Sequence, residues 1–421
     1  MKLKNRRRRS GPVVGIFWIC FMGGAAFAYA MFQGGFVSWF LFYSVMPILL
    51  YVLAVSAFPM RSLEVTREVN SEVFSSGATM RVKVTITKHS WFPLFFFIVN
   101  DRLPEPLKKN AQGETKDFRT GSRALFFPGL RRTVKYTYTV DPMPRGEFEL
   151  GDIELKTGDI FGFLQKSRVE TINQNLLVYP GYESIHSWEP FEQHEDGSRR
   201  SRHSFHFDIT SVASVRDYSP GDRLSWLDWK STARTNKLLT KEFERPLNED
   251  MIVCIDRHAD HYKEEDQLFE RAVTAASSMV RFGLKRGSSV GFISFGKEKT
   301  VFPLGSGQEQ RWRVLYHLAT TDPDGKGNYF PLLSQAFRRF PMKANVVYIT
   351  PVIDHALMRL VDGLIRRKQN VDLFLVAEER QLLQARAKEV DRLRSQGVGV
   401  YVLDGSGLNE VLKAGVRYAT S

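Results

Sequence analysis

The six residues MIVCID, from Met251 to Asp256, decide the fold class of the second half of this 421-residue chain. Five apolar residues followed by an aspartate are typical of a short strand that is buried on both faces. An amphipathic helical pattern follows over residues 264–287, and strands and helices then alternate to the end. The later predicted strands are SVGFISF (289–295), ANVVYIT (344–350), VDLFLVA (371–377) and VGVYVL (398–403). This alternation predicts an α/β domain with a mostly parallel sheet over residues 249–421, Rossmann-like in its layers.

The region before it, residues 61–180, follows a period of two. Its clearest segments are RVKVTIT (81–87), TVKYTYTV (133–140) and FELGDIEL (148–155), which are rich in β-branched and aromatic residues. Short strands between frequent Gly, Pro and Asn turns predict a β-sandwich-like domain. Residues 181–248 connect the two domains and contain a conspicuous polar segment.

The first 60 residues predict a membrane anchor. Basic residues at positions 2, 4 and 6–9 precede a stretch without any charged residue, from Ser10 to Met60. The stretch divides at Gly34 into two apolar segments of about 20 residues, the length that crosses a bilayer. We therefore predict a basic tail (1–11) and a two-helix transmembrane hairpin (12–58). The positive-inside rule then places both termini of a multi-pass protein in the cytoplasm.

A cleaved signal peptide is the competing interpretation, because AFAYA (26–30) offers small residues near a cleavage site. Signal peptides, however, have shorter apolar regions of about 7–15 residues. The two cysteines also fit a cytosolic domain: Cys20 lies in the first apolar segment and Cys254 in a buried strand, so no disulfide framework is expected.

The connecting region holds the stretch SVRDYSPGDRLSWLDWKSTARTNKLLTKEFE (214–244). Aromatic and basic residues alternate there, as in single-strand nucleic-acid sites, but acidic residues nearly balance the basic ones and weaken that interpretation. Asp222 and Asp228 could serve as catalytic carboxylates, although spacing alone shows no pocket. The favoured interpretation is a structural network in which Arg216, Lys230 and Arg234 pair with Asp222, Asp228 and Glu242. Trp226 and Trp229 are expected to shield these ion pairs.

This stretch resembles the signature of the domain of unknown function 58 family. The matching residues are Arg216, Tyr218, Gly221, Asp222, Trp229, Lys230, Ala233, Arg234 and Glu242. The resemblance continues upstream into RGEFELGDIELKTGDIFGF (145–163) and downstream into the α/β region, which looks like a von Willebrand factor A-like domain. One departure is Asp228, where the family often has histidine. The resemblance implies a membrane-anchored protein that is encoded beside a MoxR-type AAA+ ATPase.

Domains similar to von Willebrand factor A hold Mg²⁺ or Mn²⁺ with an Asp-x-Ser-x-Ser sequence after the first strand. Here Asp256 is present, but His258 and Asp260 replace the serines. The loop that should present a threonine reads GKGNYFP (325–331), and the loop after Thr350 has its aspartate displaced to Asp354. A normal adhesion-type cation site is therefore not expected. A rewired site at Asp256, His258 and Asp260, with His261 nearby, would suit Zn²⁺ or Mn²⁺; the plainer interpretation is a polar loop without a cofactor.

The sequence favours a non-catalytic function over an enzyme. We expect a membrane-anchored interaction or assembly factor that contacts membrane lipid and a MoxR-type AAA+ ATPase, and no nucleic acid. The alternative is a metal- or carboxylate-dependent enzyme with its site near Asp256 or Asp222.

Overall fold

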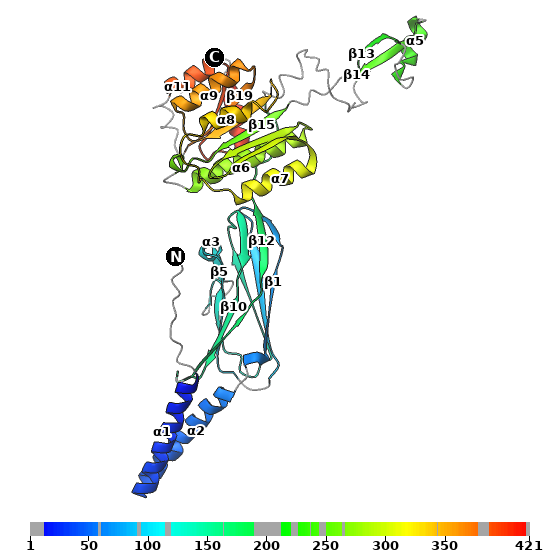
Figure 1. Ribbon diagram of the computed structural model, residues 1–421. Coiled ribbons are helices and arrows are strands. Elements are labelled where there is room, and N and C mark those ends of the chain that lie inside the picture. The colour runs from blue at the N-terminus through cyan, green and yellow to red at the C-terminus, as the bar shows by residue number, and fades with distance from the viewer. Residues whose placement is uncertain are drawn as a thin grey trace. The chain divides into compact units, whose positions relative to one another are not determined.

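The computed structural model describes residues 12–57, 60–90, 94–113, 119–162, 164–188, 212–219, 226–235, 237–243, 250–262, 266–342, 344–377 and 387–417. The chain divides into two compact units, Met1–Gly181 and Tyr182–Ser421, and each is described by itself (Figure 1). Together they form a multidomain protein of mixed helix and sheet. Gly221 and Asp222 of the signature stretch, the basic tail and the Glu242 side chain lie outside the described residues.

Two apolar helices open the first unit. α1 (Pro12–Gln33) and α2 (Phe36–Ala57) pack against each other as an antiparallel pair, with the rings of Phe27 and Phe42 5.7 Å apart (Figure 1). Gly34 turns the chain between them with a φ of 61°. Of the residues that the structure describes, those of α2 form a helix long and apolar enough to cross a membrane, with a mean hydropathy of 2.1. The structure thus supports one membrane-capable helix, and the two-span hairpin stays a prediction.

Short strands in three sheets build the rest of this unit. The first sheet has the order β1 (Leu63–Val69), β3 (Met80–Lys88), β8 (Thr133–Val140), β5 (Ala111–Gly113). The second has the order β11 (Gln165–Glu170), β10 (Ile153–Gly158), β4 (Phe97–Asp101), β7 (Arg123–Phe126), β6 (Arg119–Thr120). The third has the order β2 (Val73–Ser75), β12 (Gln174–Tyr179), β9 (Gly146–Leu150). Alternate residues of β3 are buried in one shared apolar core, as its period of two predicts. A 3₁₀ turn, η1 (Met60–Ser62), leads into β1, and a short helix, α3 (Glu105–Lys109), follows Pro104.

A buried ion pair lies within this core. Nη1 of Arg67 donates to Oδ1 of Asp101 at 2.8 Å, and both side chains are fully buried. Tyr138 donates to the other carboxylate oxygen at 2.7 Å. The Arg67 guanidinium also donates to the carbonyls of Leu150, Gly151 and Ile172. The pair is therefore hydrogen-bonded on both sides, as a buried charge requires.

The second unit contains a six-stranded sheet. Its order is β17 (Lys299–Gly305), β16 (Val290–Phe295), β15 (Met251–Asp256), β18 (Asn345–Thr350), β19 (Asn370–Val376), β20 (Gly399–Leu403). All neighbouring strands are parallel except β16 and β17. Every residue of β15, β16 and β18 is buried, because helices cover both faces. The expectation of a mostly parallel sheet agrees with this topology.

Helices divide between the two faces of this sheet. One apolar core contains residues of α6 (Asp266–Lys285), α7 (Gly307–Thr320) and α12 (Leu408–Arg417). The other contains residues of α8 (Phe330–Phe337), α9 (His355–Arg366) and α11 (Ala387–Ser395). The name von Willebrand factor A-like goes beyond this layered arrangement and stays a prediction.

Strand β17 is an edge strand that the sequence pattern did not reveal. It turns back antiparallel to β16, and the register shifts between Val290 and Phe292. Pro303 lies within it and has no backbone N–H. The Nε2 group of Gln310, in α7, donates to the carbonyls of Pro303 at 2.9 Å and Val290 at 2.8 Å.

Residues 182–188 pack on the α/β core although the sequence pattern assigned them to the connecting region. The Trp188 side chain is 1% exposed and donates from Nε1 to the Tyr401 hydroxyl at 3.1 Å. Glu183 accepts from the backbone N–H of Leu408 at 2.6 Å and so caps the first turn of α12. The core of the second unit therefore takes in residues from well before position 249.

Candidate functional site

The parallel strands place Asp256 and Thr350 side by side. β15 ends at Asp256, β18 ends at Thr350, and the register pairs Ile255 with Ile349. The Thr350 hydroxyl donates a 2.8 Å hydrogen bond to Oδ2 of Asp256. This is the carboxyl edge of the sheet, where α/β proteins bind their ligands.

The Asp256 carboxylate is bound on both oxygens by the chain itself, and its side chain is 1% exposed. Oδ1 accepts from the backbone N–H of His258 at 2.9 Å and from the Tyr329 hydroxyl. Oδ2 accepts from Nδ1–H of His261 at 2.7 Å and from Thr350. A carboxylate has about four lone-pair positions, so these donors saturate it.

Asp256 and His261 form a charged pair. Burial raises the pKa of the Asp256 carboxyl, but the hydrogen bond and charge of His261, together with the hydrogen bonds from Tyr329 and the His258 backbone, outweigh burial and leave that pKa below its ordinary value. Burial lowers the pKa of the His261 imidazole, but the hydrogen bond and charge of Asp256, together with the charges of Asp354 and Asp260, outweigh burial and leave that pKa above its ordinary value. Each partner therefore stabilises the charged form of the other.

The predicted metal ligands His258 and Asp260 lie in the loop after Asp256. The His258 ring stacks on His261 with centroids 4.6 Å apart, and its Nδ1 accepts from the backbone N–H of Asp260 at 3.2 Å. The Asp260 side chain is 58% exposed. Across the described ranges, no group of three or more His, Cys, Asp or Glu side chains is arranged to hold a metal ion. The cation site stays a prediction, and a cation would have to displace hydrogen-bond donors from Asp256.

Arg257 fixes the neighbouring loop that supplies Tyr329. Its guanidinium donates to Oδ1 of Asp324 at 2.7 Å and to the carbonyl of Asp322 at 2.9 Å, and its side chain is 5% exposed. A Cβ on Gly296 would collide with both the Asp324 carboxylate and the guanidinium. A side chain at position 296 would therefore disturb the ion pair between Arg257 and Asp324.

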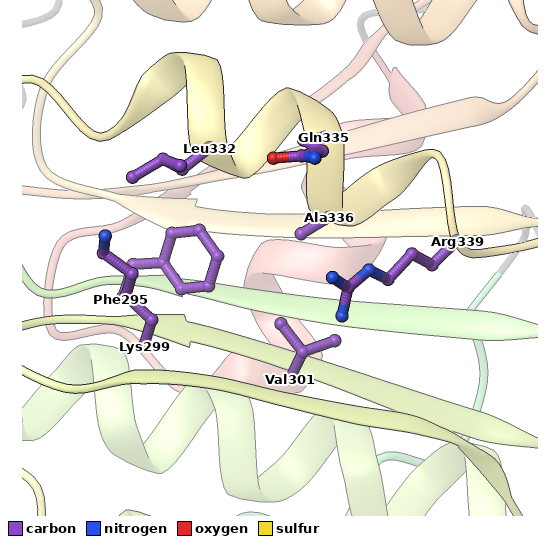
Figure 2. Close-up of a pocket in the computed structure, with 7 residues that line it drawn as sticks. All are labelled: Phe295, Lys299, Val301, Leu332, Gln335, Ala336 and Arg339. Carbon is purple, nitrogen blue, oxygen red and sulfur yellow. The ribbon is translucent and has the colours of Figure 1, made fainter.

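A half-open groove lies on the α8 face of the sheet, near this edge (Figure 2). Its volume is about 330 Å³, and β16, β17 and α8 with its following residues line it. The lining residues are Phe295, Lys299, Val301, Leu332, Gln335, Ala336 and Arg339. Apolar side chains thus form the groove, and two cations flank it.

The amino-acid sequence resembles those of known proteins. Residues 214–384 match the family described as "Protein of unknown function DUF58". Over 391 residues the chain is 30% identical to "Uncharacterized protein YeaD" of Bacillus subtilis (strain 168), covering 92% of this chain and 94% of that relative. The chain belongs to the DUF58 family.

Solved structures resemble the DUF58 chain only distantly. The PilB minor pilin of Streptococcus sanguinis is 7% identical, covers 77% of the DUF58 chain and 87% of its own, and has a TM-score of 0.28. The CARDB domain of the PF1109 protein from Pyrococcus furiosus is 11% identical, covers 29% of the DUF58 chain and 97% of its own, and has a TM-score of 0.19. Similarities this weak support no conclusion about fold or function.

The DUF58 signature folds into a hairpin with a short helix. β13 (Val212–Asp217) pairs antiparallel with β14 (Leu239–Phe243), and α5 (Trp229–Thr235) lies between them in sequence. Arg216 is exposed on β13 and donates to the carbonyl of Asp217 at 3.1 Å. Tyr218, just after β13, is half-buried, and its backbone N–H donates to the carbonyl of Leu238.

The charged residues of α5 face solvent. Lys230 and Arg234 are exposed, and Trp229, which was expected to shield the network, is 66% exposed. Asp228 has a local role: its carboxylate accepts from the backbone N–H of Lys230 at 3.1 Å and from the Ser231 hydroxyl at 2.8 Å, at the start of α5. The hydrogen bonds from Ser231 hold the pKa of the Asp228 carboxyl below its ordinary value. The full ion-pair network stays a prediction because Asp222 and the Glu242 side chain lie outside the described residues.

Sequence reasoning missed Tyr329 and Arg257 as members of the site. A signal for Tyr329 existed, because GKGNYFP was the loop in which a hydroxyl was expected from threonine. Tyrosine supplies that hydroxyl instead. Arg257 had no comparable signal, since its partners Asp322 and Asp324 are distant in sequence.

Proposed function

We propose that this DUF58 protein is a membrane-anchored cytosolic interaction or assembly factor that partners a MoxR-type AAA+ ATPase. Its second unit would act as a von Willebrand factor A-like binding domain. The choice of partner rests on the family resemblance of the signature stretch. The observation that carries the proposal is the saturated Asp256 carboxylate. A carboxylate that binds a cation or itself accepts a proton from a substrate would need a free lone pair, and here the chain's own donors occupy all of them.

The groove between β17 and α8 supports a binding function. Phe295, Val301 and Leu332 offer apolar contact, and Lys299 and Arg339 offer positive charge (Figure 2). Leu332 is 38% exposed, so a partner residue would bury apolar surface there. The chemistry of the groove fits an apolar side chain that is flanked by carboxylates, as on an acidic segment of a protein partner.

A pair of adjacent arginines makes the test specific. Arg338 and Arg339 are both exposed, but Arg339 lines the groove and Arg338 does not. Full-length protein in detergent is titrated with the MoxR-type ATPase of the same genome, with and without ATP. Arg339→Glu should raise the dissociation constant for the ATPase at least about tenfold, because the new carboxylate would repel acidic residues of the partner protein. Arg338→Glu should change the dissociation constant little. Equal effects of the two variants, or no binding by the unaltered protein, would count against the proposal.

The proposed topology has two spans and both termini in the cytoplasm. It is supported by the membrane-capable helix α2 and by the basic residues before α1. A C-terminal fusion to a reporter that is active only outside the cytoplasm should remain inactive. A strong reporter signal would mean that the C-terminus lies outside the cytoplasm, where a cytosolic ATPase could not bind the second unit.

One observation favours an enzyme as the second candidate. A buried aspartate that orients a histidine through Nδ1 is the arrangement of a general base, and Asp256 and His261 have it. His261→Gln should abolish function while preserving ATPase binding if this candidate is correct. If the structural interpretation is correct, His261→Gln should lower stability and ATPase binding together.

A further inference from the structure

Exposed apolar side chains of the first unit gather on three loops. Seven large apolar side chains between residues 60 and 181 are exposed in the described part of that range: Val73, Phe95, Phe127, Leu130, Ile160, Phe161 and Val169. Five of them form what we call the loop rim: Phe95, Phe127, Leu130, Ile160 and Phe161. Leu130 is 73% exposed and Phe127 is 69% exposed. Exposing such large apolar side chains to water is unfavourable in free energy, and a group of them marks a surface that another apolar surface covers.

The strand register brings these three loops to one end of the unit. Phe97, the first residue of β4, pairs with Phe126 at the end of β7 and with Thr157 near the end of β10. The loops before β4, after β7 and after β10 therefore open at the same edge. Backbone hydrogen bonds between Leu94 and Gly129 join the first two loops directly.

This end of the unit is also the end that holds α2. The Tyr51 ring of α2 lies 5.1 Å from the Phe95 ring and 6.3 Å from the Phe161 ring. Leu164 is buried in a small cluster with Leu49 and Val52 of α2. The loop rim is thus attached to the membrane-capable helix.

The attachment sets the depth of the loop rim. Tyr51 is six residues before the end of α2 at Ala57, which corresponds to about 9 Å along the helix axis. The polar layer on each side of a bilayer is about 5–8 Å thick. If α2 spans the bilayer, Phe95 and Phe161 therefore reach the headgroup region, where amphipathic and aromatic side chains are favoured.

Charge at the loop rim is positive. Arg131 and Arg132 directly follow Leu130 and are exposed. The acidic residue of these loops, Asp159, is buried, and its carboxylate accepts from the backbone N–H of Leu164. Basic residues near the cytoplasmic leaflet attract anionic lipids.

We infer that the loop rim inserts into the cytoplasmic bilayer interface and that Arg131 and Arg132 bind the phosphates of anionic lipids. This inference rests on the proposed membrane anchoring by α2. The first unit would then lie against the membrane through a second, amphipathic contact in addition to its helices. Such a contact fixes the unit on the bilayer more firmly than a flexible tether would.

The test uses the full chain with one reactive thiol. Cys20 is changed to serine, and Cys254 does not react because it is 1% exposed. An environment-sensitive fluorophore is attached at Leu130→Cys or, as a matched control, at Val73→Cys, which is 53% exposed at the other end of the unit. Both proteins are reconstituted into phosphatidylcholine vesicles with and without phosphatidylglycerol. Brominated lipid should quench the fluorophore at position 130 and leave the one at position 73 bright.

Lipid specificity has its own control. With brominated phosphatidylglycerol, quenching at position 130 should exceed that with brominated phosphatidylcholine. Arg131→Gln and Arg132→Gln should each lower the relative binding constant for the anionic lipid about fivefold. Arg81→Gln, on an exposed arginine at the far end of β3, should leave it unchanged.

The outcomes separate this inference from the anchor itself. If position 130 stays accessible to aqueous iodide and unquenched by lipid while the chain resists extraction at alkaline pH, the loop rim does not insert and the anchor stands. If position 130 is shielded from both quenchers, a protein surface or a second copy covers it, and the inference is wrong. If the chain is extracted, the proposed anchoring fails and this inference fails with it.

Discussion

Asp372 provides a test in which a change at a buried residue should stabilise the protein. It lies near the start of β19, is 5% exposed, and pairs in register with Gly399 of β20. A Cβ on Gly399 would collide with Oδ1 of Asp372, so the carboxyl is enclosed. Burial raises the pKa of Asp372 to about 7.

The magnitude follows from linkage between protonation and folding. The folded protein holds the Asp372 proton more tightly than the unfolded chain, in which the pKa is 3.8. The carboxyl therefore costs no stability below pH 3.8, and the cost grows as the pH rises toward 7 and is constant above it. A difference of about three pKa units corresponds to about 4 kcal/mol. Asp372→Asn keeps the shape and removes the charge, so it should recover most of this free energy at pH 8.

Cys254 offers the assay, because it is buried in β15 of the same sheet and its thiol reacts only when the sheet opens. In a Cys20→Ser background, thiol labelling of Cys254 is measured between pH 5 and pH 8 and normalised to the rate in denaturant. Asp372→Asn should slow labelling by up to roughly 10³-fold at pH 8, and by less as the pH falls.

Asp391→Asn is the matched control, since Asp391 is exposed on α11. It should leave the labelling rate unchanged at every pH. Labelling of Asp372→Asn that equals that of the unaltered protein at pH 8, or a benefit that does not depend on pH, would refute the reasoning about the buried charge.

Three further experiments test other parts of the structure. Arg67→Ala should lower the free energy of unfolding by about 3–5 kcal/mol, because it leaves the buried Asp101 carboxylate without its cation. Lys83→Ala, in an exposed ion pair, should lower it by less than about 1 kcal/mol. The rate of proteolysis of the first unit measures both losses, and similar values for the two variants would contradict the role of the buried pair. Burial lowers the pKa of His317 to about 4, so the folded protein loses stability as the pH falls from 6.5 toward 4. Labelling of Cys254 should therefore become faster over this pH range, and His317→Phe should remove that acceleration. An unchanged pH profile in the variant would exclude His317 as its source. Calorimetry with Mg²⁺ should show no tight binding, because Asp256 is saturated; micromolar binding that Asp256→Asn abolishes would restore the cation site.

The sequence predicted the features that depend on local periodicity. The buried run MIVCID and the strands after it alternate with amphipathic helices, and this pattern is sufficient to predict a mostly parallel sheet. β17 was not predicted, because it contains Pro303 and begins at Lys299 after the charged residues Lys297 and Glu298. An edge strand of this kind lacks the apolar pattern of a central strand.

The sequence named loop residues of the candidate site, among them His261, but it did not predict the contacts that they make. Asp256 and Thr350 follow from strand order, since parallel strands end at one edge. The two further side-chain donors to Asp256 come from the loop positions His261 and Tyr329, and such contacts depend on tertiary packing between loops. Asp228 was interpreted as a charge partner, yet its local hydrogen bonds show a helix-capping role that only the backbone conformation reveals.

The edge strand β17 is held to the sheet partly by a side chain. Pro303 cannot donate to the ladder with β16, and the register between the two strands shifts in the same region. The Gln310 amide binds the carbonyls of both Pro303 and Val290 and so joins the two strands there. Lys299 and Val301, which line the groove, lie toward the other end of β17, where the backbone pairs with β16. A partner that binds the groove therefore meets a strand that is held at both ends, by backbone pairing at one and by Gln310 at the other.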